Sequence, residues 1–325
     1  MRWIVSLIAI VAAPVVARGQ AELVEVRKVW DRANHNAFTD LIRFRDAWFC
    51  TFREGSSHVS PDGALRILTS ADGRDWTSAA LLTSPSADLR DPKLSLMPDG
   101  RLLLVGVSVT REGGKASYQS MTWTSDDGRR WSEGHKVGDP DVWLWRTAWH
   151  DGAAYGVGYS TSKDKFTRLY KGDAGRFEPI VSPLFDRGYP TEAALAFQPD
   201  GTGLCLLRRD GKGPEASAQL GRSSPPYTSW TWKDLGKQVG GPGLVVLPDG
   251  RIVAGVRLYD KKVRTSLCWL DPEAGTLAEF LALPSGGDTS YPGLVWHDDR
   301  LWVSYYSSHE GKTSIYVAKV KLPTK

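Results

Sequence analysis

Charged and phenolic side chains recur at regular places along this chain of 325 residues, on either side of a series of aspartate-centred turns. About eight residues before the turns stand Thr39-Asp40, Arg90-Asp91 with Lys93, residues 143–146, Glu192 and residues 288–291. About eight residues after them stand Arg53-Glu54, Tyr159, Arg208-Arg209, Arg257 and Tyr305-Tyr306. Carboxylates transfer protons, guanidinium groups bind carboxylates through a fork of donors, and a phenol reacts once a base activates it. Brought together, these groups can bind an acidic ligand and carry out acid–base chemistry.

The turns that separate the two groups repeat six times, at intervals of about 50 residues. Their aspartates are Asp46, Asp99, Asp151, Asp200, Asp249 and Asp298. Alternating apolar, β-branched and aromatic residues flank the turns, as in residues 101–107, 251–256 and 301–305, and Asp-Gly between such runs is a strong hairpin signal. No segment keeps the spacing of an amphipathic helix over three turns. The sequence therefore predicts an all-β fold, a six-bladed β-propeller of four-stranded antiparallel blades.

The blades are predicted over residues 33–81, 88–137, 141–181, 189–235, 240–282 and 288–322, the last completed by residues 22–32. An unclosed blade would expose unpaired backbone groups, so the strand over residues 23–30 is expected to pair with the strand over residues 314–320. If the aspartate turns all lie on one face, the two groups of polar residues meet at the opposite end of the central axis.

Two further turns carry a more specific pattern, in residues 70–76 (SADGRDW) and 125–131 (SDDGRRW). Weaker versions surround Asp173 and Asp271. They resemble the Asp box, or BNR repeat, of the sialidase superfamily, in which the aspartate binds turn backbone groups and the tryptophan packs between sheets. The resemblance implies a six-bladed propeller and gives these turns a structural role.

Four residues follow the order of the sialidase active site, namely Glu192, Arg208, Arg264 and Tyr291. The resemblance implies that Glu192 takes the proton from Tyr291, which attacks the anomeric carbon, while Arg208 and Arg264 bind the substrate carboxylate. A neutral phenol suits a sugar whose carboxylate would repel a carboxylate nucleophile. Asp62, in the loop before the first Asp box, matches the place of the family's acid, with His58 as a competing polar group.

The first inner strand departs from the sialidase pattern. Sialidases open it with an arginine, whereas residues 36–42 (NAFTDLI) contain none. Arg53 and Arg90 are the candidates to replace this guanidinium; without a replacement, the substrate is another acidic sugar or a neutral one. Asp91, Trp145 and Asp288 complete the predicted substrate-binding residues, with Trp145 either stacking on a sugar or packing between blades.

The function predicted from this resemblance is that of a retaining exo-glycosidase of the sialidase type, acting on a terminal sialic acid or a related acidic sugar. The alternative is a propeller with an eroded site that binds glycan or protein without turnover. The formal net charge of +4 is too small for a nucleic-acid partner. Cys50, Cys205 and Cys268 show no metal-ligand spacing, so the sequence predicts buried thiols, no metal and no cofactor.

The apolar run over residues 4–17 is shorter than the roughly 20 residues of a membrane span. The run ends in the small-residue pattern Val15-Val16-Ala17, which offers a cleavage point, and the whole segment is typical of a secretory signal peptide. We predict a signal peptide over residues 1–21, one propeller domain over residues 22–325, secretion or export to a periplasm, and no membrane span after cleavage. The sequence indicates no oligomeric state.

Overall fold

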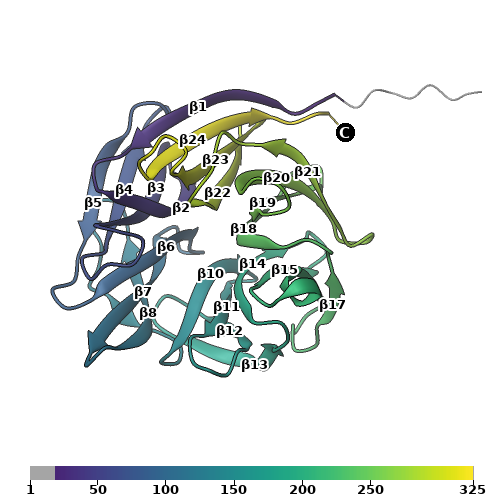
Figure 1. Ribbon diagram of the computed structural model, residues 1–325, viewed down its shortest axis with the longest axis horizontal. Helices are drawn as coiled ribbons and strands as arrows, with labels where there is room; N and C mark the ends of the chain where they lie inside the picture. Colours follow the sequence, from purple (N-terminus) through teal and green to yellow (C-terminus); the bar gives the residue numbers. More distant parts are fainter. Residues whose placement is uncertain (1–18, 325) are drawn as a thin grey trace, which may run out of the picture.

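Six four-stranded antiparallel sheets surround a central axis in the computed structural model, which describes residues 19–324 (Figure 1). The predicted six-bladed β-propeller is therefore confirmed. Residues 1–18 of the predicted signal peptide lie outside the described residues. Within residues 19–324, no helix has the length and apolar character needed to cross a bilayer.

The first three blades follow one another along the chain, each starting at the axis. Blade 1 contains β2 (His35–Phe44), β3 (Ala47–Gly55), β4 (Ala64–Ser70) and β5 (Thr77–Leu82). Blade 2 contains β6 (Asp88–Leu96), β7 (Leu102–Glu112), β8 (Lys115–Ser125) and β9 (His135–Lys136). Blade 3 contains β10 (Val142–His150), β11 (Ala153–Ser160), β12 (Thr167–Gly172) and β13 (Phe177–Phe185).

The next blades repeat this order, and their bounds agree with the predicted ones to within a few residues. Blade 4 contains β14 (Pro190–Phe197), β15 (Gly203–Arg209), the 3-10 turn η1 (Gly213–Ala216), β16 (Gln219–Ser223) and β17 (Thr231–Asp234). Blade 5 contains β18 (Val239–Val246), β19 (Ile252–Leu258), β20 (Arg264–Asp271) and β21 (Thr276–Ala282). Blade 6 contains β22 (Thr289–His297), β23 (Arg300–Ser307), β24 (Ser314–Lys321) and β1 (Glu22–Trp30).

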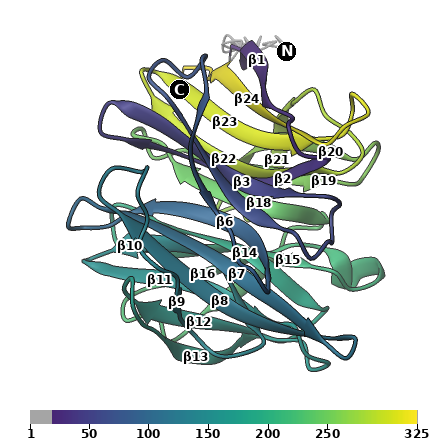
Figure 2. The ribbon, with the colours of Figure 1, turned by 90° about the vertical axis from the view of Figure 1, so that its left-hand side faces the viewer.

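The two ends of the chain close the ring within blade 6. β1 pairs antiparallel with β24, from Leu23 opposite Val320 to Trp30 opposite Ile315. Figures 1 and 2 show the two strands side by side, with β1 on the outside of the sheet. The predicted closure is confirmed, and it gives the backbone of β24 a partner on both sides.

Every innermost strand carries a β-bulge at the same position, where two of its residues face one residue of the second strand. The bulged pairs are residues 38–39, 91–92, 145–146, 191–192, 241–242 and 291–292. A bulge breaks the two-residue alternation of a strand and redirects side chains, which is why bulges are frequent beside active sites. Three pairs end in proline, which lacks the N–H that a regular ladder would need.

The hairpins between the third and fourth strands are held in shape by aspartates in four of the six blades. In four of them, the Oδ1 of an aspartate accepts backbone N–H groups two and three residues further on. These are Asp72, Asp127, Asp173 and Asp271. In blade 1, Trp76 donates its ring N–H to the carbonyl of Gly73 at 3.1 Å and packs in the cluster that holds Trp302 of blade 6.

A glycine-to-alanine pair tests this contact between blades. Gly73 and Gly100 both have left-handed backbones, with φ of 74° and 82°, but a Cβ at Gly73 would lie 2.5 Å from the Trp302 ring while one at Gly100 meets nothing within 4 Å. Gly100→Ala is expected to lower the free energy of unfolding by about 1 kcal/mol through backbone strain. Gly73→Ala adds overpacking, for a loss of about 2–4 kcal/mol. Urea unfolding measures both; equal losses would show that Trp302 moves aside at no cost.

Candidate active site

A phenol, a carboxylate and a guanidinium meet where blades 4 and 6 face the axis. The Tyr291 hydroxyl donates a short hydrogen bond to Oε1 of Glu192, which also accepts one from Nη1 of Arg208 at 2.8 Å. Its Oε2 accepts the backbone N–H of Gly241 at 2.8 Å. Glu192 and Tyr291 belong to the bulges of β14 and β22, and Arg208 is the residue that faces the first of these bulges. The repeated bulge therefore positions the pair.

The surroundings of Glu192 and Tyr291 shift their pKa values in opposite directions. Burial acts to raise the pKa of Glu192, but the Arg208 guanidinium and the hydrogen bonds from Tyr291 and Gly241 outweigh it and hold that pKa below its ordinary value. Burial raises the pKa of Tyr291 well above its ordinary value, and the negative charge of Glu192 adds to the shift. The resting site thus holds an ionised carboxylate beside a protonated phenol, which is the arrangement of a base and its nucleophile.

A second carboxylate, Asp91, lies in the bulge of β6 with an exposed fraction of 6%. Its Oδ1 has no hydrogen-bond partner among residues 19–324. Burial raises its pKa, although Arg90 and Lys93 act in the opposite direction, and the nearby Glu192 charge raises it further. A carboxyl group whose pKa is raised stays protonated to higher pH, and in that form it can donate a proton to a leaving group.

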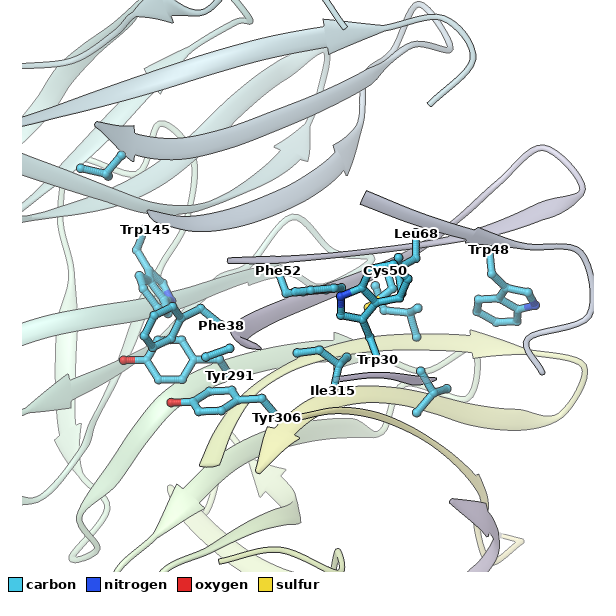
Figure 3. Packing of buried hydrophobic residues seen from close by; sticks show 14 of the residues in the cluster. Trp30, Phe38, Trp48, Cys50, Phe52, Leu68, Trp145, Tyr291, Tyr306 and Ile315 are labelled. Atoms are coloured by element: carbon cyan, nitrogen blue, oxygen red, sulfur yellow. The ribbon is translucent and has the colours of Figure 1, made fainter. Parts of the chain in front are cut away.

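The Tyr291 ring is bordered by Tyr306 and Arg257. The Arg257 guanidinium lies 5.6 Å above that ring and donates to the Tyr306 hydroxyl at 2.9 Å. Tyr306 in turn donates to Oδ1 of Asp288 at 2.9 Å. Figure 3 shows the hydroxyls of Tyr291 and Tyr306 pointing to the same side. The mouth of the site therefore combines two phenols with cationic groups.

Arg90 and Trp145, which the sequence predicted to bind substrate, both lie beside the site, but they make different contacts. The Arg90 guanidinium lies 5.3 Å from the centroid of the Phe38 ring and donates to the backbone carbonyl of His58 at 3.1 Å. Trp145 is 1% exposed and meets Tyr291 edge to face at 5.0 Å between ring centroids, as Figure 3 shows. The prediction that Trp145 stacks on a sugar is wrong, because the ring is covered; its open alternative, packing, holds.

The structure does not bring Arg53 to the site. Arg53 is fully buried and donates to Oδ1 of Asp88 at 2.8 Å and to the carbonyls of Ser57 and Ser60. All of its donors point into the protein, so it cannot replace the missing substrate-binding arginine. It instead anchors the loop that connects β3 and β4.

Arg264 and Asp62 are also placed apart from the Tyr291–Glu192 pair. Arg264 forms a two-pronged ion pair with Glu279 of the neighbouring strand and contacts Asp260, so cross-strand pairing accounts for it. Asp62 accepts hydrogen bonds from the backbone and hydroxyl of Ser56. Hydrogen bonds from Ser56 and Ser60 lower the pKa of Asp62, which makes it a poor proton donor.

The sequence analysis placed Arg257 and Tyr306 at the mouth but assigned neither of them to catalysis or substrate binding. The signal that identifies both is their position in the repeat. Arg208, Arg257 and Tyr306 each stand about eight residues after the turn aspartate of their own blade, and Tyr159 does so in blade 3. Equivalent positions of successive blades face the same axis, so Arg257 is the second arginine there instead of Arg264.

Comparison with known proteins gives the fold a name. No protein-family model and no curated protein matches the chain, but solved structures do. A protein of unknown function from Dyadobacter fermentans superposes with a TM-score of 0.82 at 21% identity, over 93% of this chain and 99% of that one. A Trypanosoma rangeli sialidase gives 0.67 at 12% identity, over 88% of this chain and 54% of the sialidase. The chain has the six-bladed sialidase-like propeller fold.

Other structures with this sialidase-like propeller fold also match. The GH93 α-L-arabinofuranosidase of Fusarium graminearum, solved with arabinobiose, superposes with a TM-score of 0.72 at 14% identity, over 93% of this chain and 98% of that one. Likeness at such low identity establishes the fold alone, and one fold serves many chemistries. The function therefore depends on the residues at the axis.

Proposed function

We propose that this sialidase-like propeller is a retaining exo-glycosidase that uses Tyr291 as its nucleophile and acts on a terminal acidic sugar of the sialic acid type. The observation that carries the proposal is the hydrogen bond from the Tyr291 hydroxyl to Glu192, a carboxylate held in place by Arg208 and by the backbone of Gly241. A phenol is a weak nucleophile, and a fixed, ionised base within hydrogen-bond reach is what activates it.

The proposed reaction has two displacements. In the first, Glu192 accepts the phenolic proton while the Tyr291 oxygen bonds to the anomeric carbon, and Asp91 protonates the departing glycosidic oxygen. In the second, Asp91 takes a proton from water as that water attacks the same carbon and the Tyr291–sugar bond breaks, and Glu192 returns its proton to the phenol. Two inversions retain the configuration, and both carboxyl groups return to their starting states.

The charge around Tyr291 favours an acidic sugar. Arg208 and Arg257 come from two blades and place positive charge beside the ring. Arg208 already binds Glu192 and Asp210, and Arg257 binds Tyr306, so each would bind a substrate carboxylate through its remaining N–H donors. The Trypanosoma rangeli sialidase was solved with 2,3-difluorosialic acid as a covalent intermediate, which agrees with this chemistry. A terminal arabinofuranoside is the second candidate, because the first inner strand lacks the sialidase arginine and the GH93 enzymes share nearly their whole length with this fold.

A panel of aryl glycosides tests the proposal. Purified protein is incubated with nitrophenyl sialosides, uronides and α-L-arabinofuranosides, and released nitrophenol is recorded. Release from the sialoside, with the sugar product first formed in the configuration of the substrate by NMR, is the expected result. Release from the arabinofuranoside alone would replace the proposed substrate, and no release from any would favour a glycan-binding propeller. The predicted signal peptide extends the proposal to an enzyme that acts outside the cytoplasm.

Asp91→Asn is expected to separate the acid from the nucleophile. Because the pKa of Asp91 is raised, the native group stays protonated to higher pH than an ordinary aspartic acid, and activity falls as pH rises through that pKa. The variant should lose this alkaline limb and slow by about 10²–10⁴-fold on alkyl glycosides, which need protonation, but much less on nitrophenyl glycosides. pH profiles of kcat/KM on both substrates measure this.

The matched variant is Asp62→Asn, at the carboxylate that the sequence favoured as the acid. Its side chain is tied to Ser56 in the loop after β3, so the alkaline limb should persist. A limb lost in Asp62→Asn and kept in Asp91→Asn would return the acid role to Asp62.

A further inference from the structure

Two histidines and an aspartate from three separate segments converge at the mouth, between blades 1 and 6. Nε2 of His35, at the start of β2, lies 3.0 Å from Oδ2 of Asp288, which precedes β22. Nδ1 of His58, from the loop after β3, lies 2.7 Å from the same oxygen. All three ligand-type atoms lie within 4.8 Å of one another. Neither the predicted chemistry nor the proposed mechanism uses any of these contacts.

Surrounding groups hold the three side chains in position. The other carboxylate oxygen of Asp288 accepts the Tyr306 hydroxyl, and the backbone N–H of Asp288 donates to Ser308 at 2.8 Å. The Phe38 ring lies against both imidazoles, 6.0 Å from His35 and 5.0 Å from His58 between ring centroids. Hydrogen bonds such as those to Asp288 orient ligating carboxylates in proteins, and the Phe38 ring limits the space open to the two imidazoles.

We propose that His35, His58 and Asp288 bind a divalent transition-metal ion of the zinc class. Two imidazole nitrogens and a carboxylate oxygen are a usual ligand set for zinc, at about 2.0–2.2 Å from the ion. Tetrahedral geometry at these lengths separates ligand atoms by about 3.4 Å, so the pairs at 3.0 and 2.7 Å would have to open by about 0.4 and 0.7 Å, and the two histidine nitrogens, within 4.8 Å of each other, would have to come closer. His58 has a half-exposed side chain that can make these shifts. The exposed side leaves the fourth position to water or a substrate hydroxyl.

Two features make this an exchangeable site instead of a structural one. With a metal on Nε2, the proton of His35 moves to Nδ1, which is buried and has no hydrogen-bond partner among the described residues. The Arg257 guanidinium also lies 3.7 Å from Oδ1 of Asp288. Since an absent outer partner typically costs 10–100-fold in affinity, we expect binding weaker than that of a structural zinc site by about this factor. The inference does not depend on the glycosidase proposal.

The test is metal binding by the full, tag-free protein, measured with zinc chloride by calorimetry and with cobalt chloride by visible absorbance. We expect one ion per chain and a cobalt band that reports nitrogen and oxygen ligands. His58→Ala and Asp288→Asn should weaken binding by at least about tenfold. The matched control is His135→Ala, a substitution at an exposed histidine on β9 that should bind as the native protein does.

Two results would overturn the proposal. The first is native protein that binds zinc no more tightly than His58→Ala and Asp288→Asn do. The second is an equal loss in His135→Ala, which would indicate adventitious binding to surface histidines. His35 is buried, so weaker binding in His35→Ala could come from a disturbed fold as well as from a lost ligand. The test therefore uses His58 and Asp288, and circular dichroism checks that these variants are folded.

Discussion

Tyr291→Phe is expected to lower kcat on a nitrophenyl sialoside by at least about 1,000-fold while the protein stays folded. The substitution removes one oxygen, whose only hydrogen bond among the described residues is to Glu192. Phenylalanine retains the ring contacts with Phe38, Trp145 and Tyr306. Because the lost atom is the proposed nucleophile, kcat should fall far more than KM rises. Steady-state kinetics on the purified variant measures both constants.

Tyr305→Phe is the matched control for this prediction. Tyr305 is fully buried in the neighbouring strand β23, and its hydroxyl donates to the carbonyl of Pro284, away from Glu192. This variant should lose about 1 kcal/mol of stability and keep its kcat. A Tyr291→Phe enzyme as fast as native would reject the nucleophile, and an equal loss in both variants would assign the effect to packing.

Arg53→Met is expected to lower the free energy of unfolding by about 3–5 kcal/mol. Both partners of the Arg53–Asp88 pair have side chains with no exposed surface, so methionine would leave the Asp88 carboxylate buried without the guanidinium that hydrogen-bonds to it. The other oxygen of Asp88 has no hydrogen-bond partner among the described residues; Arg90 and Arg111 lie 3.8 and 4.0 Å from it, so they offset part of the lost charge but replace no hydrogen bond. Chemical denaturation with urea measures the loss.

The comparison is Arg101→Met, which breaks an ion pair of the same type at the surface. Arg101 and Asp99 have side chains 44% and 46% exposed, and an exposed pair contributes at most about 1 kcal/mol. Similar small losses in both variants would mean that water enters the Arg53 site. A large loss in Arg53→Met alone would show that Arg53, which the sequence predicted to bind substrate, stabilises the fold instead.

The blades could be predicted because six aspartate-centred turns recur in the sequence at intervals of about 50 residues. The turn aspartates set the register, and the alternation of apolar residues on either side set the strands. Their positions in the repeat then placed Glu192, Arg208 and Tyr291 at the axis, and the resemblance to sialidases singled them out among the other polar residues there. The position in the repeat carried more information than the residue type.

The sequence did not predict where individual arginine side chains point. Arg264 and Arg208 both lie near strand ends and both pair with carboxylates. Arg264 pairs with Glu279 on the adjacent strand, whereas Arg208 pairs with Glu192, the partner of Tyr291. Arg53 is captured by Asp88 at the start of the next blade. Such choices depend on ion pairs between distant segments, which spacing along one strand does not reveal.

The bulges were also beyond sequence reasoning. A simple two-residue alternation assigns each side chain of an inner strand to one face, whereas an inserted residue shifts that assignment. In β6 this shift buries Asp91 beside Glu192. It explains why the better candidate for the acid was assigned to substrate binding and Asp62 was taken in its place.

The pairing of β1 with β24 has a consequence for biosynthesis. A ribosome makes β1 first and its partner last, so this hydrogen-bond ladder has to wait until nearly 300 intervening residues have been made. During that wait the nascent chain has a strand without its sheet and cannot complete the ring. Such long-range pairing is slow and leaves intermediates prone to self-association. We therefore expect a chain shortened by β24 to collect in aggregates, even though five of its blades are intact.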